Sequence, residues 1–449
     1  MNLNGKQVSF KTNHNSNFHP YRILFLLAVI FGMVFFVRAI DAGMVKRPYD
    51  PTATPTRTNR SFELEAQTHF RAGNLNAAIA AYQSAIELNP ENPSLYAELA
   101  RLQVYSSASL STDDEKTTRL HEALDVINKA AELFPDDSNV HAVRAFVLDW
   151  NANPIVSGNQ SESMLTQAEQ AAVRAIQLDP QNTLALVYYA EVLMDSKKYD
   201  QAQQYIDQAL QRGSDLIDAH RVRGQMYEIN GQYLDAVEEY KKALQIMPNM
   251  TFLYVYIGLN YRVMAANNPE SPYYESALEN FASAAKINNT LGIRDPIPYL
   301  AIAKTYSQKG DHFAAALNGR KALAYNPANA DVYGQLGITY FQGKNYEGAI
   351  PALKCAIRGC TPTESCKARN CDEEKDEPIS IAGLPLSNST VVYYYTYGSV
   401  LAGLSRKTEN YCPDARAVFG EVKAKYGNDT DIMRIVNDGL AICTSLDAP

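Results

Sequence analysis

The sequence predicts an all-α protein: a solenoid of about nine helix hairpins with a C-terminal capping helix, preceded by one transmembrane helix. Three observations indicate this fold class. An alanine-centred pattern recurs along most of the chain, and three of its eight intervals equal 34 residues. A chain of 449 residues exceeds the roughly 250 to 300 residues at which a single core stops growing, so it must divide or repeat. One uncharged apolar run near the N-terminus is nearly long enough to cross a bilayer.

Residues 21–40 are predicted to form a transmembrane signal anchor. Fifteen consecutive apolar residues within this stretch carry no charge. The stretch reaches the ~20 residues that a span requires if Arg22 and Arg38 extend their charged ends toward the interface. The alternative is a cleaved signal peptide with Val37 and Ala39 at the small-residue positions of the cleavage site. The polar lead is long for a signal peptide, which favours the anchor.

The remaining boundaries follow from composition. The stretch from 47 to 60 contains three prolines and four threonines without apolar periodicity, which is typical of an extended spacer. The predicted parts are therefore a short polar tail at 1–20, the anchor at 21–40, a Pro/Thr-rich linker at 41–60, repeats one to eight at 61–358, a Cys-containing acidic insertion at 359–390, and a ninth repeat with the capping helix at 391–449.

Each hairpin is marked by an alanine followed at fixed offsets by a large residue, a second alanine and a proline. The fifth unit has Ala236, Tyr240, Ala243 and Pro248, with the small residue Gly224 twelve positions before the first alanine. A small side chain where two helices cross lets their axes approach to about 8–10 Å while larger neighbours pack around it. The proline ends the second helix because the residue before a proline is disfavoured in the α region.

These residues resemble the tetratricopeptide repeat family, whose 34-residue unit has small, aromatic, alanine and proline positions at the same offsets. The resemblance covers about Ser61 to Ser445, and the proline is replaced locally at Ser214, Asn289 and Gly427. It implies a right-handed superhelix in which the first helix of each repeat lines a concave groove. It also implies that the groove binds protein or peptide partners.

The resemblance maps that groove onto residues near the small position of each first helix. Tyrosine and arginine are common there, and both are enriched at binding hot spots. The alternative for any one aromatic is packing between helices. The predicted partner-binding residues are Tyr105, Trp150, Tyr188, Arg221, Tyr256, Arg262, Lys304, Phe341 and Tyr395.

Three insertions separate the two helices of a hairpin: Ser106 to Arg119, Asn151 to Met164 and Ala266 to Tyr273. Insertions on one edge of a solenoid often form a binding face. They are also tolerated as plain surface loops, because loop closure costs little extra entropy as length grows. Both interpretations remain open from the sequence.

The charge of the chain disfavours nucleic acid as a partner. The first forty residues contain four basic side chains and no acid, so the remainder has 41 − 4 = 37 basic and 49 acidic residues, a net charge of −12. A surface of this sign repels phosphate backbones. We therefore expect no nucleic-acid binding.

All six cysteines lie in the last 95 residues. Their spacing lacks the close pairs and histidines of a zinc site, which favours disulfides and places the body outside the cytoplasm. Cys412 lies at the start of a second helix and Cys443 near the end of the capping helix beside it, so these two are predicted to pair. The pairing of the other four cysteines stays open, because six cysteines permit fifteen connectivities.

No catalytic residue, cofactor or metal site is predicted. The sequence lacks phosphate-binding glycine loops and metalloprotease or serine-hydrolase motifs, and Ser283 with Lys286 lies in a helix whose Ala284 faces the core. The predicted function is a membrane-tethered, non-catalytic scaffold for protein partners. The alternative is an accessory subunit in cell-envelope polymer biogenesis, because the layout resembles membrane-anchored tetratricopeptide proteins with a rubredoxin-like module, although the cysteine spacing departs from theirs.

Overall fold

The computed structural model describes residues 20–42, 44, 58–213, 215–266, 268–372 and 375–447. The chain forms two compact units, Met1–Arg57 and Thr58–Pro449, and the second is called the body below. The predicted polar tail lies almost entirely outside the described residues, as does most of the predicted linker. The body begins slightly earlier than predicted, because its first helix starts at Asn59.

The described part of the first unit is dominated by helix α1 (Pro20–Asp41). Its segment Pro20–Ile40 is long and apolar enough to cross a membrane by length and composition. Apolar residues surround the helix on all sides, as expected of a membrane span. A signal sequence near an N-terminus has the same properties, so both sequence-based interpretations of this helix fit the structure.

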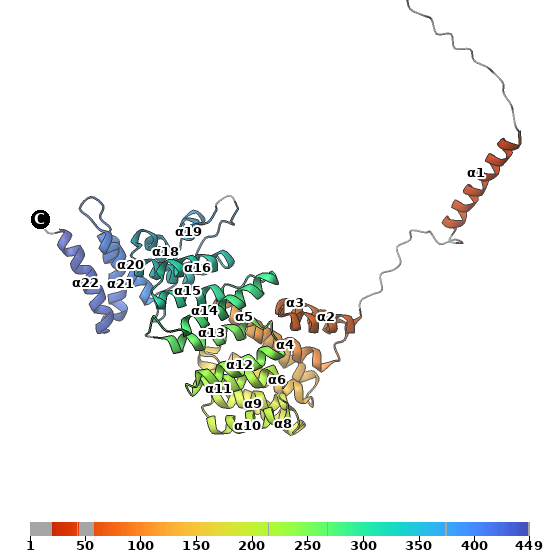
Figure 1. Ribbon diagram of the computed structural model, residues 1–449, viewed down its shortest axis with the longest axis horizontal. Helices are drawn as coiled ribbons and strands as arrows, with labels where there is room; N and C mark the ends of the chain where they lie inside the picture. The colour runs from red at the N-terminus through yellow and green to blue at the C-terminus, as the bar shows by residue number, and fades with distance from the viewer. Residues whose placement is uncertain are drawn as a thin grey trace, which may run out of the picture. The chain divides into compact units, whose positions relative to one another are not determined.

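The body is a solenoid of stacked helix hairpins, as the sequence predicts (Figure 1). Within the described residues, the two helices of each hairpin pack against each other, and each hairpin packs against the next one. The nine hairpins are α2 (Asn59–Ala72) with α3 (Leu75–Leu88), α4 (Pro93–Ser107) with α5 (Asp113–Leu133), α6 (Ser138–Asn151) with α8 (Ser161–Leu178), α9 (Thr183–Asp195) with α10 (Tyr199–Arg212), α11 (Ile217–Ile229) with α12 (Tyr233–Ile246), α13 (Thr251–Ala265) with α14 (Tyr273–Thr290), α15 (Ile297–Lys309) with α16 (His312–Tyr325), α17 (Ala330–Gln342) with α18 (Tyr346–Arg358), and α20 (Val391–Leu404) with α21 (Cys412–Tyr426).

Short polar residues begin many of these helices. The side chain of Asn74 accepts a hydrogen bond from the backbone N–H of Ala77 (3.2 Å), and Asn182 accepts one from Ala185 (3.2 Å). Such N-caps satisfy backbone donors that have no partner inside the helix. In these helices the connecting residues therefore help to set where the helix starts.

The recurring small residue lies where the two helices of a hairpin cross. A Cβ atom on Gly224 would lie 2.5 Å from the ring of Tyr240, and one on Gly258 would lie 2.4 Å from the ring of Phe281. Contacts this short force the ring or the helix to move, which costs about 1–3 kcal/mol in a packed core. Close helix approach thus depends on the small position that the sequence pattern identifies.

Two of the three insertions add helix rather than loop. The first lengthens α5, which has 21 residues compared with 14 in α3. The second forms α7 (Pro154–Ser157), the 3₁₀ turn η1 (Gly158–Gln160) and the first turn of α8. The third, before α14, contains no helix of its own within the described residues.

Two short-range disulfides shape the connection between α18 and α20. Cys355 pairs with Cys360, and Cys366 pairs with Cys371, with Cα–Cα distances of 4.8 and 4.9 Å. Helix α19 (Pro362–Arg369) lies between them. These two pairs resolve the connectivity that the sequence leaves open.

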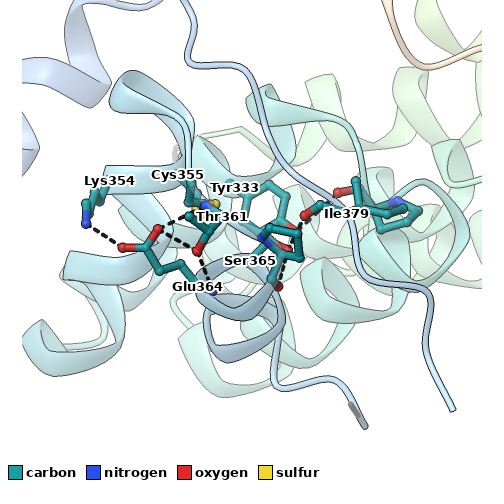
Figure 2. Close-up of a disulfide and its surroundings, with 10 residues drawn as sticks. Tyr333, Lys354, Cys355, Thr361, Glu364, Ser365 and Ile379 are labelled. Carbon is teal, nitrogen blue, oxygen red and sulfur yellow. Dashed lines mark hydrogen bonds and ion pairs between the residues drawn. A yellow bond between two sulfur atoms is a disulfide. The ribbon is translucent and has the colours of Figure 1, made fainter. Parts of the chain in front are cut away.

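The first of these disulfides lies beside a polar helix cap (Figure 2). Thr361 and Glu364 form a reciprocal capping box at the start of α19, and Lys354 lies 2.6 Å from Glu364. These hydrogen bonds lower the pKa of Glu364 to about 2. Ser365 donates a hydrogen bond to the carbonyl oxygen of Ile379 (2.6 Å). This bond holds the segment around Ile379 against α19.

The C-terminal end of the body is closed by α22 (Thr430–Asp447), which packs against α20 and α21. A third disulfide joins Cys412 at the start of α21 to Cys443 in α22, with a Cα–Cα distance of 5.5 Å. Both cysteines are fully buried. This is the pair that the sequence analysis predicts.

Candidate functional site

Three of the predicted groove residues, Tyr105, Tyr188 and Arg221, lie in the interior of the body rather than on an open surface. Their exposed fractions are 1%, 0% and 0%. The prediction that these three side chains line an accessible groove is therefore wrong. They belong to a buried group of charged and aromatic side chains, here called the central cluster, which consists of Arg101, Tyr105, Tyr188, Glu191, Asp218 and Arg221.

Asp218, in the first turn of α11, is the main acceptor of the central cluster. It is fully buried and accepts hydrogen bonds from Arg101 Nη2 (2.5 Å), from the Tyr188 hydroxyl (2.8 Å) and from the Tyr105 hydroxyl. The donors come from α4 and α9. One carboxylate therefore links the second, fourth and fifth hairpins.

Arg221 forms the second half of the central cluster. Its guanidinium donates two hydrogen bonds of 2.6 Å to Glu191 on α9 and lies 5.2 Å from the ring centroid of Phe146 on α6. The indole N–H of Trp150 donates to the same Glu191 carboxylate (3.1 Å). Bidentate pairing and stacking on an aromatic face are the two contacts that suit a buried guanidinium.

The electrostatics of the central cluster favour one set of protonation states. Burial alone would raise the pKa of Asp218, but Arg101 and Arg221, with the hydrogen bonds from Arg101 and Tyr105, hold it below its usual value. Burial and the Asp218 charge raise the pKa values of Tyr105 and Tyr188. At neutral pH the cluster thus combines ionised Asp218 and arginines with neutral tyrosine hydroxyls.

The central cluster lies where the superhelix returns on itself. Arg101 on α4 and Asp218 on α11 are 117 residues apart in sequence, and the ring of Tyr105 stacks on Phe252 of α13 at 5.3 Å. Further along the chain, Asn326 donates to the hydroxyl of Ser111 (2.7 Å). Helix α4 therefore contacts α11 and α13 on the concave side, where the sequence analysis predicts an open groove.

A cavity of about 510 Å³ opens next to the central cluster and is called the acidic pocket below. Its walls come from α6, the α7 insertion, α8, α9 and α11. Four carboxylates and no basic side chain line it. The lining residues are Asp149, Trp150, Ala152, Asn153, Pro154, Ser161, Leu165, Glu191, Met194, Asp195, Gln225, Glu228 and Ile229.

A second cavity, of about 380 Å³, lies in the C-terminal half and is called the C-terminal groove. It is lined mainly by the first helices of three consecutive hairpins, α15, α17 and α20, with two residues of α16. Lys304 is exposed in its wall, and Asp331 accepts a hydrogen bond from the Tyr393 hydroxyl (2.6 Å). The lining residues are Leu300, Ala303, Lys304, Ser307, Ala315, Gly319, Asp331, Val332, Gln335, Leu336, Ile338, Thr339, Gln342, Val392 and Tyr393.

Lys304 has an unusual electrostatic setting for a surface lysine. Desolvation in the concave wall lowers its pKa, with Arg262 and Lys116 acting in the same direction and Asp331 in the opposite one. A partner carboxylate beside Lys304 would therefore relieve repulsion among basic groups. Of the predicted groove residues, Lys304 is the one that lines the C-terminal groove.

The other predicted groove residues are half-buried. Trp150 lines the acidic pocket, whereas Tyr256, Arg262, Phe341 and Tyr395 line neither cavity. Tyr256 lies 5.6 Å from Tyr240 between ring centroids, and Arg262 lies 5.9 Å from Phe281. Both contacts are packing between neighbouring helices, which is the alternative that the sequence analysis leaves open.

The sequence analysis missed acids of the central cluster and of the acidic pocket. Asp218, Asp149 and Asp195 have no motif around them. Asp218 lies in the first turn of α11, where an acid is common because it interacts favourably with the helix dipole. The available signal is the insertion after Asn151, which supplies α7 to the wall of the acidic pocket. The sequence alone does not distinguish a binding face from a plain surface loop at this insertion.

The chain matches family models along its body. A model described as TPR repeat matches residues 66–104, and models described as Tetratricopeptide repeat match residues 161–226, 217–250 and 300–363. These matches cover hairpins in both halves of the solenoid. They support a protein-interaction scaffold, because tetratricopeptide repeats bind protein partners and are generally non-catalytic.

Curated relatives share part of the chain. The human antiviral innate immune response effector IFIT1 is 26% identical over 243 residues, which are 50% of this chain and 49% of the relative. The bovine BBSome complex member BBS4 is 29% identical over 163 residues, 36% of this chain and 28% of the relative. The chain thus spans about half or less of the length of these relatives.

Solved structures agree with the fold. The human IFIT1 dimer with m7Gppp-AAAA aligns with a TM-score of 0.53 and 19% identity, covering 85% of this chain and 81% of that chain. The human IFIT1 dimer with PPP-AAAA aligns with a TM-score of 0.51 and 19% identity, covering 85% and 82%. Identity at this level supports the helical solenoid alone. Together with the family models, it identifies the chain as a tetratricopeptide repeat protein.

Proposed function

We propose that this protein is a non-catalytic scaffold that α1 tethers to a membrane and that binds protein or peptide partners in the C-terminal groove. The observation that carries the proposal is the groove itself, a cavity built mainly from the first helices of three successive hairpins. Its wall combines apolar residues with Lys304, Gln335 and Gln342. Mixed polarity along a concave surface suits a peptide, whose backbone needs hydrogen bonds and whose side chains need apolar contact.

The proposal also assigns the body to the outside of the cytoplasm. All six cysteines are paired in three disulfides. Structural disulfides persist in oxidising compartments and are rare in the cytosol. A membrane helix followed by a disulfide-bonded body is consistent with a single-pass protein whose C-terminal part faces that compartment.

Nucleic acid is not part of the proposal, although IFIT1 has been solved with m7Gppp-AAAA. After its first forty residues, this chain has 49 acidic and 37 basic side chains, a net charge of −12. Four of these acidic side chains line the acidic pocket. Phosphates bind where basic side chains gather, so this charge distribution opposes RNA.

Affinity capture from solubilised membranes tests the proposed groove. The bait is the tagged full chain, compared with the double variant Lys304→Glu/Gln342→Trp, which reverses the exposed charge and fills the groove. We expect at least one protein to be enriched about tenfold or more by the natural chain and lost by the variant. Lys423→Glu on the outer helix α21 is the matched charge-reversal control, and it should retain the partner because its exposed site lies outside the groove.

Other outcomes of the capture would overturn the assignment. Equal recovery by the natural chain and the groove variant would show that the C-terminal groove is not the peptide site. Recovery of glycan or lipid-linked material without protein would favour the alternative, an accessory subunit in cell-envelope polymer biogenesis. Release of the full chain by alkaline extraction, which strips peripheral proteins, would contradict the membrane tether.

A further inference from the structure

The acidic pocket contains a buried carboxylate oxygen without a donor. Asp149, on α6, has an exposed fraction of 3% and lines the pocket, and its Oδ1 atom has no hydrogen-bond partner among the described residues. A buried acceptor left unpaired costs about 1–3 kcal/mol. A ligand that brings a donor to this oxygen would recover that cost.

The neighbouring acids lack basic partners in the pocket lining. Glu191 is matched by Arg221, which lies behind the pocket wall. Asp149, Asp195 and Glu228 have no basic side chain beside them in the pocket lining. Glu228 accepts a hydrogen bond from the amide of Asn260, which carries no charge. The pocket therefore suits a ligand with positive charge.

The titration of these groups agrees with the geometry. Burial, followed by the charges of Asp195 and Glu191, raises the pKa of Asp149 well above its ordinary value. Desolvation by the surrounding wall, followed by the charge of Glu191, raises the pKa of Asp195 to about 6, and desolvation also raises the pKa of Glu228. Arg221 acts in the opposite direction on both aspartates. An empty pocket thus retains protons that a bound cation would displace.

The form of the pocket selects an organic cation over a metal ion. Within the part of the chain that the structure describes, no group of three or more His, Cys, Asp or Glu side chains lies close enough to hold a metal. A guanidinium has five donors in a planar fork, so it bridges separated carboxylates and stacks on an aromatic ring. Trp150 supplies such a ring in the pocket wall, and tryptophan is the strongest cation–π partner.

We propose that the acidic pocket binds an arginine side chain of a protein partner. The guanidinium donates to Asp149 Oδ1 and to Asp195, and packs against Trp150. The volume of about 510 Å³ admits a whole side chain with part of its backbone. This inference rests on the proposed protein-binding function, but it concerns a different cavity from the C-terminal groove.

Calorimetric titration of the full chain in detergent tests the inference. The probe is a short capped peptide with one arginine between glycines, and its matched control replaces arginine with citrulline, which has the same shape without the charge. We expect saturable binding of the arginine peptide and at least tenfold weaker binding of the citrulline peptide. Binding should tighten from pH 5 to pH 7.5 as Asp195 ionises, with release of protons near pH 6.

Three variants separate the pocket from general charge effects. Asp149→Asn and Asp195→Asn should each weaken the arginine peptide about tenfold, because each keeps the shape and removes one carboxylate charge. Asp125→Asn, an exposed acid of α5 that lies outside the pocket lining, should leave the affinity unchanged. Asp195 is exposed at the pocket rim, so its variant remains informative if Asp149→Asn fails to fold.

Several results would overturn the inference. They are equal binding of the arginine and citrulline peptides, no effect of either pocket variant, or no detectable binding at millimolar peptide. Tighter binding of free spermidine or of calcium would assign the pocket to small cations instead of a protein side chain. A failed peptide titration together with a successful capture through the C-terminal groove would refute this inference alone, whereas failure of both would also refute the proposed function.

Discussion

Replacing Asp218 with asparagine is expected to destabilise the body by about 3–5 kcal/mol, because it breaks the buried ion pair between Asp218 and Arg101. Asp218 accepts hydrogen bonds from Arg101, Tyr105 and Tyr188 in a fully buried site. Urea denaturation followed by circular dichroism measures the change. Because the carboxylate links α4, α9 and α11, the loss should spread over the N-terminal hairpins instead of one helix.

The control for this variant is Asp207→Asn. Asp207 pairs with Arg223, but this ion pair is partly exposed, with side-chain exposures of 42% and 17%. Surface pairs of this kind contribute about 0–1 kcal/mol. An Asp218→Asn variant no less stable than Asp207→Asn would contradict the role of the central cluster.

The pH dependence of the same variant follows from the direction of the Asp218 shift. Its pKa in the folded protein lies below the ordinary value of 3.8. The stabilisation is therefore present above pH 3.8 and is lost as the pH falls through the lower, folded-state pKa. The natural chain should therefore lose this stabilisation as the pH falls. Asp218→Asn has no carboxylate at that position, so its stability should not show this loss.

Removing the disulfide between Cys412 and Cys443 is expected to cause the second large loss of stability. The bond closes a sequence separation of 31 residues, for which the chain-entropy model gives about 3–4 kcal/mol. In the double variant Cys412→Ala/Cys443→Ala, α22 is expected to detach while the N-terminal hairpins stay folded, because contacts in a solenoid are mostly between neighbours. Amide hydrogen exchange should show lost protection in α20 to α22.

A shorter disulfide provides the comparison. Cys355 and Cys360 are separated by 5 residues, so removing that bond should cost about 2 kcal/mol in the same model. If the two double variants lose protection equally, the closed loop is not the source of the stabilisation. Loss of protection throughout the body after removal of the C-terminal bond would contradict the local role of α22.

The hairpins were predictable because their signals are local. Gly224, Ala236 and Tyr240 pack inside one repeat, and Pro248 follows the end of its second helix. The Cys412–Cys443 pair was predictable for the same reason, since the two helices are adjacent. The remaining four cysteines offered several pairings between nearby residues, and sequence spacing does not rank them.

Whether the predicted groove residues are exposed or buried was not predictable, because it depends on contacts between distant repeats. Arg101 and Asp218 meet only after the superhelix has turned through several hairpins. Nothing near Tyr105 or Arg221 in the sequence shows that α4 will approach α11 and α13. An exposed groove residue and a buried cluster residue therefore have the same local pattern, and only the curvature of the solenoid separates them.

Photo-crosslinking of the full chain in its own membranes tests the scaffold account most directly. A benzophenone amino acid placed at Lys304 lies in the C-terminal groove, and the same probe at Lys423 lies exposed on α21, outside the groove lining. The account predicts a discrete adduct with another protein from position 304 and none with that protein from position 423. Adducts with that protein from 423 alone, or the same adducts from both positions, would contradict partner binding in the groove.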